Sequence, residues 1–473
     1  MSAAADIRAR DVVAWSDGNL LSGDADLLFE SVSIDTRSCE PGALFFAIRG
    51  PRHDAHRFLL QACERGATGL VVERTRARGQ SLPAGVACIE VDDSTRALGA
   101  VASGHRARFR GPLLAITGSS GKTTTKEMCA SVLAALGPCL ATHGNLNNEF
   151  GVPLTLLRRQ PADRSAVIEL GMNHRGEIAR LAEIARPQIG LVTNIGTAHI
   201  EFLGSRDEIA QEKGDLYAAL PSDGIALVNL DDERVAAQAR RAACRQLTYA
   251  RGRAAEVSEQ GVRFDAGRFH IRIHAAGQTR DVAVRGLADT TVINALAACA
   301  AGLAAGARLE DVCEGLAAYQ PIRGRMTPVR GAGAITVVDD TYNANPDSLR
   351  AALLAVRELA ERDASQGARA IAVLGDMGEL GDAADAAHRE AGALAAGLGF
   401  GALLALGERA ALVCEGALAA GMKSDDVHIA RSHDDAAERV SGLARSGDWV
   451  LVKGSRSMQM ERVVDALETQ ESH

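Results

Sequence analysis

A glycine-rich stretch of the sequence has the composition of a loop that binds phosphate groups. Residues 117–124 are Thr-Gly-Ser-Ser-Gly-Lys-Thr-Thr, between a short apolar run and a helical pattern. Glycines let backbone N–H groups approach a phosphate and the first turn of a helix favours an anion, so Lys122 can reach terminal phosphates and the Thr123 hydroxyl can bind Mg²⁺. The usual motif has glycine where this chain has Ile116. The succession of strand, loop and helix predicts binding of ATP or GTP rather than an ordinary Gly/Ser turn.

Two side chains that can bind a metal follow later strands of the same region. Glu169 lies at the end of the strand predicted over 166–170, and His199 follows the strand predicted over 189–195. The carboxyl ends of strands in an open α/β sheet share the crevice that holds the phosphate loop, so these two residues could bind Mg²⁺ or Mn²⁺ beside the triphosphate. Taken singly, each is more often a helix cap or a solvated loop residue. Their position at strand ends favours the metal site.

Lys213 stands on the apolar face of a predicted helix. In the helix predicted over 207–220 it lies four residues after Ile209 and four before Tyr217, which puts all three on one face. Its ammonium either reaches past the apolar surface into water, or it is desolvated and partly neutral. A desolvated amine could be chemically modified or catalytic, and the spacing alone does not choose between the two.

A second group of polar residues follows strands nearer the C-terminus. Asp339 and Asp340 end one predicted strand and precede Thr-Tyr-Asn-Ala-Asn-Pro at 341–346. A carboxylate there can face an interdomain cleft and a nucleotide's ribose or metal, and the alternative is a strand terminator with an Asx turn. The sequence Lys-Gly-Ser-Arg at 453–456 occupies the same place after another strand. It predicts an anion-binding loop rather than an ordinary polar loop.

The elements that must position these residues alternate between strands and helices. Short apolar runs with helical patterns between them predict a mostly parallel, doubly wound sheet. In the middle of the chain the predicted strands are 113–116, 166–170, 189–195 and 225–229, and toward the C-terminus they are 335–338, 371–374, 403–406 and 450–452. Residues 250–285 have the pattern of short antiparallel strands instead. Three further apolar runs among turns precede residue 108, at 43–48, 69–72 and 86–91.

We therefore predict an α/β protein of three domains. The predicted boundaries are 1–108 for a small N-terminal α/β domain, 109–325 for a central domain with a P-loop-type doubly wound parallel sheet, and 326–473 for a C-terminal Rossmann-like domain. Gly324, just before the last change of pattern, supplies a flexible joint. A length of 473 residues agrees with a prior of about 150 residues per domain.

Composition narrows the classes of function. The chain is 47% apolar and 24% charged, as in globular proteins, and its net charge of −8 has the wrong sign for a main partner that is a nucleic-acid backbone or an anionic membrane. Nine scattered cysteines indicate reduced thiols. The first residues lack the apolar segment of a secretory signal, and the uncharged runs 290–307 and 391–407 predict a buried helix and a helix–loop–strand rather than membrane spans. We expect a cytoplasmic protein.

Together the motifs resemble those of the Mur ligases, a family of peptidoglycan precursor synthesis. The resemblance covers nearly the whole chain. It is carried by S-I-D-T-R at 33–37, P-G-A-L-F at 41–45, T-G-S-S-G-K-T-T at 117–124, G-N-L-N-N-E-F-G-V-P at 144–153, E-L-G-M-N-H-R-G-E-I at 169–178, Ala198-His199, E-K-G at 212–214, D-D-T-Y-N-A-N-P at 339–346, G-D-M-G-E-L-G at 375–381 and K-G-S-R at 453–456. The motifs at 375–381 and 453–456 resemble those of the family members that add D-alanyl-D-alanine. The D-N-P-R motif of the diaminopimelate-adding members and an N-terminal G-x-G-x-x-G are absent.

The resemblance implies a role for individual residues. Lys122, Glu169, His199 and Lys213 would be catalytic, and Mg²⁺ (or Mn²⁺) would be held by Thr123, Glu169, His199 and Lys213, the last as a carbamate that replaces a buried cation by an oxygen ligand. ATP would be bound by Gly118, Ser119, Ser120, Gly121, Lys122, Thr123, Thr124, Asn294, Arg325, Asp340, Tyr342 and Asn343. The other substrates would be bound by Ser33, Asp35, Thr36, Arg37, Asn145, Asn147, Asn148, Asn345, Lys453, Ser455 and Arg456. The family's His-Asn pair ahead of Asn294 is Thr290-Thr291 here, so no adenine contact is assigned to these two.

The implied activity is that of an ATP-dependent acid–amino-acid ligase. The γ-phosphate of ATP would activate the carboxylate of UDP-N-acetylmuramoyl-tripeptide as an acyl phosphate, which the amine of D-alanyl-D-alanine then attacks, while closure of the third domain aligns the amine and excludes water. We expect a monomer that acts on small molecules.

Three alternatives are a folylpolyglutamate synthase, a nucleotide-dependent switch or assembly factor, and a nucleic-acid motor. A folate ligase would not need a separate UDP-binding domain of about 100 residues, and the charge balance disfavours a nucleic-acid motor. The identity of the third residue of the tripeptide, diaminopimelate or lysine, stays open.

Overall fold

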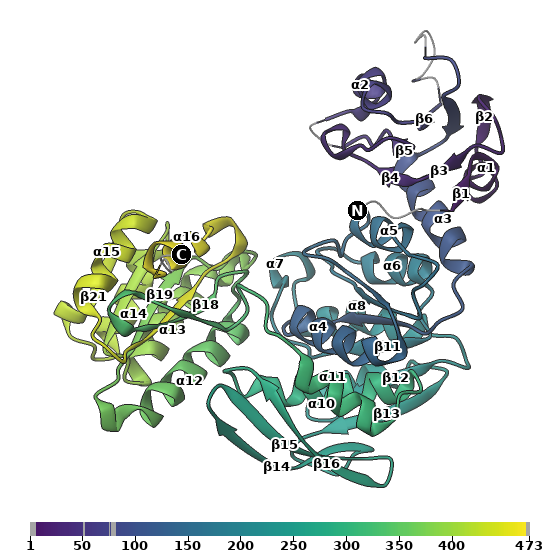
Figure 1. The fold of residues 1–473 in the computed structure, drawn as a ribbon. Helices are drawn as coiled ribbons and strands as arrows, with labels where there is room; N and C mark the ends of the chain where they lie inside the picture. Colours follow the sequence, from purple (N-terminus) through teal and green to yellow (C-terminus); the bar gives the residue numbers. More distant parts are fainter. Residues whose placement is uncertain (1–5, 51–52, 75, 77–81, 470–473) are drawn as a thin grey trace.

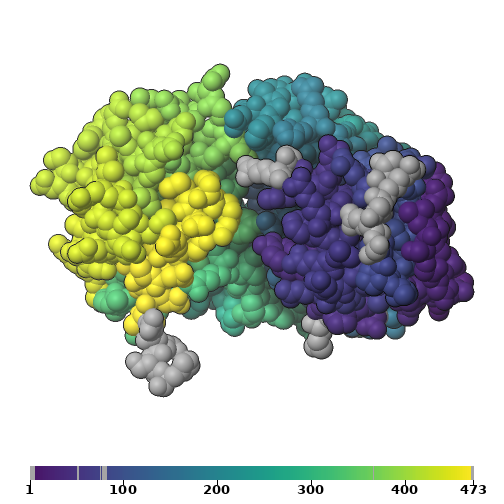
Figure 2. All heavy atoms as spheres, turned by 90° about the horizontal axis from the view of Figure 1, so that it is seen from above, coloured from purple at the N-terminus to yellow at the C-terminus, as the bar shows by residue number. Residues whose placement is uncertain are grey.

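The computed structural model of this protein describes residues 6–50, 53–74, 76 and 82–469. Three large sheets, each built from its own stretch of chain, and a two-stranded sheet carry the fold (Figure 1). The predicted α/β class with several mostly parallel sheets is confirmed. Seen from above, the N-terminal part in purple and the C-terminal part in yellow lie on opposite sides, with teal residues of the central part visible between them (Figure 2).

The N-terminal sheet has five strands in the order β2-β7-β6-β5-β4, parallel except for β2. Its strands are β2 (Asn19–Ser22), β4 (Ser31–Ser33), β5 (Ala43–Phe46), β6 (Gly69–Glu73) and β7 (Ala87–Val91); β1 (Ile7–Arg8) and β3 (Leu28–Phe29) form the separate pair. Its helices are α1 (Ala9–Ser16), α2 (Leu59–Glu64) and α3 (Ser94–Ala107). All four residues of β5 are buried, which explains its continuous apolar run.

The central sheet has nine strands in the order β16-β15-β14-β13-β12-β11-β8-β10-β9. They are β8 (Leu113–Thr117), β9 (Cys139–Ala141), β10 (Ser165–Glu169), β11 (Ile189–Val192), β12 (Ile225–Asn229), β13 (Arg245–Ala250), β14 (Val257–Asp265), β15 (Arg268–Ala275) and β16 (Gln278–Arg285). The strands from β9 to β14 pair in parallel, and β14 to β16 pair antiparallel. The antiparallel pattern predicted after residue 250 is therefore correct, and these strands extend the parallel sheet.

Helices cover both faces of the central sheet. One face packs against α4 (Lys122–Leu133), α10 (Thr290–Ala304) and α11 (Leu309–Ala318), and the other against α5 (Gly151–Leu157), α6 (Glu177–Ala185), α8 (Arg206–Ala218) and α9 (Glu233–Ala239). A short helix, α7 (Ile200–Leu203), follows His199. β8, β10 and β11 are buried throughout, as strands sandwiched between two helical layers must be.

The C-terminal sheet has six strands in the order β17-β18-β22-β19-β20-β21, parallel except for β17. They are β17 (Thr327–Arg330), β18 (Thr336–Asp340), β19 (Ala370–Gly375), β20 (Ala402–Leu406), β21 (Val427–Ala430) and β22 (Trp449–Lys453). The helices are α12 (Pro346–Arg362), α13 (Ala384–Gly397), α14 (Ala410–Ala419), α15 (His433–Leu443) and α16 (Glu461–Leu467). The edge strands β17 and β21 were not predicted because each has only four residues and is largely exposed or half-exposed, so neither shows a long apolar run.

The uncharged runs have the structures predicted for them. Residues 290–304 form α10, whose side chains are mostly buried, and residues 391–407 contain the end of α13, a loop and β20. Within the described residues no helix is long and apolar enough to cross a membrane. All nine cysteines are free thiols.

The N-terminal part is attached to the central part through helix α3. The buried Arg106 guanidinium donates hydrogen bonds to the carbonyl oxygens of Ala185 (3.0 Å) and Arg186 (3.1 Å) at the end of α6, and to Gln188 Oε1 (2.8 Å). The guanidinium thereby satisfies carbonyl groups that a helix end leaves unpaired. Burial lowers the pKa of Arg106 to about 10. The helix and the hydrogen bonds of Arg106 together make this junction rigid.

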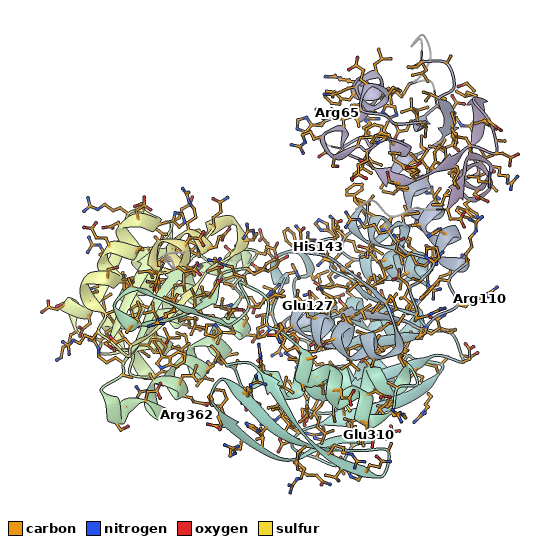
Figure 3. All side chains as sticks on the ribbon, in the orientation of Figure 1. Arg65, Arg110, Glu127, His143, Glu310 and Arg362 are labelled. Atoms are coloured by element: carbon orange, nitrogen blue, oxygen red, sulfur yellow. The ribbon has the colours of Figure 1, made fainter. Side chains whose placement is uncertain are left out.

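The C-terminal part is joined by a loop and touches the central part at both ends of α12. At the first turn Asp347 Oδ2 accepts hydrogen bonds from the Thr197 backbone N–H (2.8 Å) and hydroxyl (3.0 Å). At the last turn the Arg362 guanidinium lies 4.5 Å from the ring centre of Phe264 on β14. Figure 3 labels Arg362 at the lower edge of the C-terminal part, beside that hairpin.

A pH-dependent loss of stability is expected from His105 on α3. Its side chain is 1% exposed and both ring nitrogens are buried without a hydrogen-bond partner among the described residues. Burial, together with Arg159 and Arg108, lowers the pKa of His105 to about 4 from 6.5. The folded state therefore disfavours protonation, and stability that is complete above pH 6.5 is lost as the pH falls toward 4, by about 3 kcal/mol.

The measurement is urea unfolding of the wild type and of His105→Phe between pH 7.5 and 4.5. As the pH falls, the free energy of unfolding of the wild type should decrease more steeply than that of His105→Phe. His270→Phe is the control for replacing a histidine by phenylalanine. Parallel curves for wild type and His105→Phe would contradict the assignment.

Candidate active site

The loop at 118–121 is held in shape by the end of β11. The Ser119 backbone N–H donates to the Asn194 carbonyl oxygen (3.0 Å), the Ser120 N–H donates to Asn194 Oδ1 (3.0 Å), and the Thr193 hydroxyl donates to the Ser120 carbonyl oxygen (2.7 Å). Gly118 has φ +149° and Gly121 has φ +74°, a backbone region that other residues rarely adopt. The glycines are required here by backbone geometry.

A cavity of about 980 Å³ lies between the central and C-terminal parts. Most of the residues predicted for the site line it: Ser119, Ser120, Gly121, Lys122, Thr123, Thr124, Asn145, Asn147, Asn148, Glu169, His199, Asn294, Arg325, Asp340, Tyr342, Asn343, Asn345, Lys453, Ser455 and Arg456. Thr290 and Thr291 also line it, next to Leu287 and Ala288, so an apolar and hydroxyl-bearing wall adjoins Asn294. Figure 3 labels Glu127 and His143 on the side of the central part that faces the C-terminal part.

Positive charge gathers beside the phosphate loop. Lys122 Nζ donates to the Gly118 carbonyl oxygen (2.7 Å), and burial lowers the pKa of Lys122, against the attraction of Glu169. Arg325 Nη2 donates to the Thr123 hydroxyl (3.0 Å), and its guanidinium lies 3.9 Å from the ring centre of Tyr342. Half-buried cations beside a helix N-terminus fit a polyphosphate.

Glu169 offers one open carboxylate oxygen. The side chain is 2% exposed, Oε1 accepts a hydrogen bond from Asn147 Nδ2 (2.9 Å), and Oε2 is buried without a partner among the described residues. An unpartnered buried carboxylate oxygen is costly, and a cation beside it would satisfy it. Mg²⁺ commonly takes one or two carboxylates and completes its shell with phosphate and water, so the absence of three or more clustered His, Cys, Asp or Glu residues in the described chain is compatible with it.

His199 is held against the C-terminal part. Its φ of +66° is rare for a residue other than glycine, and its Nδ1 lies 2.7 Å from Glu379 Oε2. Glu379 was not among the residues predicted for the site, although the motif 375–381 contains it. The contact was not visible in the sequence, because it joins two domains.

Lys213 is fully enclosed in the protein. Its side chain is 1% exposed, which rules out the alternative in which the ammonium reaches water, and in the described chain its amine has no hydrogen bond or ion pair. Burial, together with the charge of Lys122, places the pKa of Lys213 well below its usual value. The adjacent Glu212 is engaged elsewhere, since its carboxylate accepts hydrogen bonds from the N–H groups of Gly176 (2.8 Å) and Ile178 (2.9 Å) at the start of α6. Lys213 does not line the cavity.

The two aspartates at the end of β18 hold the joint between the parts. Asp339, fully buried, accepts a hydrogen bond from the Gly324 N–H (3.0 Å), and Asp340 Oδ1 accepts one from the Met326 N–H (3.2 Å). Lys453 Nζ lies 2.5 Å from Asp340 Oδ2 and donates to the Asn343 carbonyl oxygen (2.9 Å). Of the two aspartates, Asp340 faces the cavity.

Four predicted substrate residues lie apart from the cavity. Ser33, Asp35, Thr36 and Arg37 belong to the N-terminal part and do not line it. Arg37 Nη2 lies 2.6 Å from Asp35 Oδ2, and this hydrogen bond lowers the pKa of the Asp35 carboxyl. Two other predicted residues also serve as helix caps, because Asn148 Oδ1 accepts from the Gly151 N–H at the start of α5 and Asn345 Oδ1 from the Ser348 N–H in α12.

Family models match the chain along most of its length. The Mur ligase middle domain matches residues 116–302, the Mur ligase glutamate ligase domain matches 324–456, and the Mur ligase family catalytic domain matches 29–106. A curated relative, the UDP-N-acetylmuramoyl-tripeptide–D-alanyl-D-alanine ligase of Escherichia coli, is 36% identical over 95% of this chain and 97% of its own length.

Solved structures give the same result. A crystal structure of MurF from Acinetobacter baumannii has a TM-score of 0.85 and 31% identity, covering 97% of this chain and 98% of that one. MurF ligase from Thermotoga maritima in complex with ADP has a TM-score of 0.81 and 25% identity, covering 93% and 97%.

The phosphate loop should not tolerate a side chain at Gly118. A Cβ built there would lie 1.9 Å from Thr193 Oγ1, at a φ of +149°. Gly118→Ala is therefore expected to lower affinity for a fluorescent ADP analogue at least tenfold, because the loop must leave the shape set by Thr193 and Asn194. Gly261→Ala is the control, since nothing lies within 4 Å of a Cβ there. If the two variants bind the ADP analogue with equal affinity, the loop does not take part in nucleotide binding.

Proposed function

The chain belongs to the Mur ligase family, in the MurF branch, and from that premise we infer an ATP-dependent ligase that joins D-alanyl-D-alanine to UDP-N-acetylmuramoyl-tripeptide in peptidoglycan precursor synthesis. The observation that carries the proposal is the composition of one cavity. One wall of the cavity contains a phosphate loop, half-buried cations and an open carboxylate oxygen, and the C-terminal part forms the other wall. Such a cavity can hold a nucleotide and two further reactants out of water.

The reaction needs ATP because a carboxylate does not react with an amine at neutral pH. We propose that the tripeptide carboxylate attacks the γ-phosphorus of ATP, forming an acyl phosphate and releasing ADP. The amine of D-alanyl-D-alanine then attacks the acyl carbon, and the amide forms as phosphate leaves. Lys122 and Arg325 stabilise the negative charge on the transferring phosphoryl group, and the backbone N–H groups in the first turn of α4 orient the β- and γ-phosphates.

Glu169, His199 and the Thr123 hydroxyl would hold Mg²⁺, with Lys213 as a further ligand once modified. Bound there, the ion neutralises phosphate charge. The buried Glu169 Oε2 without a partner is the feature of the site that fits a cation. Arg325 Nη2 donates a hydrogen bond to the Thr123 hydroxyl, so this guanidinium lies next to the position proposed for the ion.

We further propose that Lys213 carries a carbamate in the active enzyme. A neutral amine adds to CO₂, forming an N–C bond and releasing one proton, and the product is an anionic oxygen ligand. The support is the burial of Lys213, its lack of a partner in the described chain, and its low pKa, caused first by burial and then by Lys122. Carbamylation replaces an amine whose protonation is opposed by burial and by Lys122 with an anion that Lys122 attracts.

The N-terminal part would bind the UDP-linked end of the substrate through Ser33, Asp35, Thr36 and Arg37. Because these residues do not line the cavity, the UDP end would lie outside the cavity that holds the reacting carboxylate. Asn145, Asn147 and Asn148 line the cavity and would contact the part of the substrate inside it. The division into domains 1–108, 109–325 and 326–473 is part of this proposal. So is a cytoplasmic location, which agrees with nine free thiols.

The activity is tested by the dependence of ATP turnover on both acceptors. Phosphate release should require UDP-N-acetylmuramoyl-tripeptide and D-alanyl-D-alanine together, and tripeptides with diaminopimelate or lysine establish the third residue. Lys122→Ala should lower turnover at least a thousandfold with an unchanged unfolding midpoint, because the loss falls on transition-state charge. Turnover with ATP alone, or near-normal turnover of Lys122→Ala, would contradict the proposal.

The carbamate is tested with variants of Lys213. Lys213→Ala should lose most activity with little loss of stability, and a small carboxylate such as acetate should restore part of the activity by filling the ligand position. Lys213→Arg keeps the charge and cannot form the carbamate, so it should also be inactive. Full activity of Lys213→Arg, or a high-resolution map with an unmodified lysine in the liganded enzyme, would overturn the assignment.

A further inference from the structure

The carboxylate of Glu379, in the C-terminal part, lies next to the imidazole of His199, in the central part. Glu379 lies in the loop between β19 and α13, His199 lies in the loop between β11 and α7, and Oε2 of one is 2.7 Å from Nδ1 of the other. Both residues have left-handed backbones, φ +62° and +66°. Residues other than glycine keep such conformations only where the surrounding structure enforces them, and they often do so at functional sites.

The loop that carries Glu379 is fixed from three sides. His388 Nε2, on α13, accepts a hydrogen bond from the Met377 N–H (3.0 Å), and the Ser455 hydroxyl, after β22, donates to the Asp376 carbonyl oxygen (2.8 Å). The Asp376 carboxylate in turn accepts from the N–H groups of Glu408 (2.8 Å) and Arg409 (3.1 Å). These contacts make the loop a rigid part of the C-terminal sheet.

The loop that carries His199 is also held by the C-terminal part. Asp347 accepts both hydrogen bonds from Thr197, two residues before His199. A Cβ on Gly196 would lie 2.3 Å from Asp347 Oδ2, so the close approach needs glycine. The C-terminal part therefore holds this loop at two points, Asp347 on its backbone and Glu379 on its imidazole.

A carboxylate beside one ring nitrogen decides what the other can do. Histidines that bind metals almost always donate their second ring N–H to a carboxylate, carbonyl or water, which fixes tautomer and ring orientation. Glu379 Oε2 lies 2.7 Å from Nδ1, an ion-pair contact in which Nδ1 makes no hydrogen bond of good geometry among the described residues. A proton on Nδ1 facing this carboxylate would leave the lone pair of Nε2 for a metal.

We propose that Glu379 is the positioning residue for His199, supplied by the C-terminal part, so that binding of a divalent cation and docking of that part are coupled. The inference rests on the proposed function, in which His199 binds Mg²⁺. By linkage, the ion binds more tightly to the docked arrangement and favours docking by the same factor. A Glu169 site without His199 would bind the ion less tightly.

The test is Mn²⁺ titration, followed by electron paramagnetic resonance, of the full chain with ADP present. Glu379→Gln should weaken Mn²⁺ at least tenfold, the usual effect of losing such a partner. His199→Ala should weaken it as well, and the double variant should bind no more weakly than His199→Ala. Without metal, Glu379→Gln should bind ADP with the same affinity as the wild type. Asp382→Asn removes a carboxylate three residues away and should bind Mn²⁺ like the wild type.

Small-angle scattering supplies the reciprocal measurement. Adding Mn²⁺ with ADP should lower the radius of gyration of the wild type and leave that of Glu379→Gln unchanged. If Glu379→Gln binds Mn²⁺ normally while His199→Ala binds it more weakly, His199 remains a ligand and only the positioning role of Glu379 is overturned. If Glu379→Gln lowers Mn²⁺ affinity by the same factor in His199→Ala as in the wild type, the positioning role is also overturned. The Glu379 carboxylate would then act on the ion directly rather than through His199. Normal affinity of His199→Ala would overturn the metal assignment and this inference together.

Discussion

Basic side chains inside the site without a paired carboxylate are the constraint on which the site depends. Among the described residues Lys122 donates a hydrogen bond to the Gly118 carbonyl oxygen, and Lys213 has no hydrogen bond or ion pair. Such charges are tolerated inside a protein when an anion completes them. The parallel strands β8, β10 and β11 supply the frame, since their carboxyl ends bring the phosphate loop, Glu169 and His199 to the same edge. The cavity is thereby organised around a polyanion.

Local features of the fold and site were predictable because neighbours in sequence determine them. The strand, loop and helix at 113–133 follow from an apolar run, two glycines and helical spacing, and the burial of Lys213 agrees with its place between Ile209 and Tyr217. Strand ends were less accurate. The strand predicted to Ile195 ends at Val192, because the Thr193 and Asn194 side chains turn to hold the phosphate loop.

Contacts between domains were not predictable from spacing. Asp347 and Thr197 are 150 residues apart, and either would pass for a surface residue of its own element. The same holds for Glu379 and His199, which meet only when two separately folded sheets are docked. The central strand β13 was also missed, because polar residues interrupt its apolar ones. The resemblance to a family supplied roles for residues, and only the three-dimensional structure supplied these partners.

The two-sided construction of the cavity has a consequence for inhibition. A compound that fits the docked cavity touches Asn294 on one wall and Ser348 or Ala352 of α12 on the other, a set of contacts that neither part offers alone. Its apparent dissociation constant therefore includes the fraction of molecules that are docked. If the parts must separate to release such a compound, its residence time depends on the rate of that separation as well as on its own contacts. Compounds selected for slow dissociation would report on that motion directly.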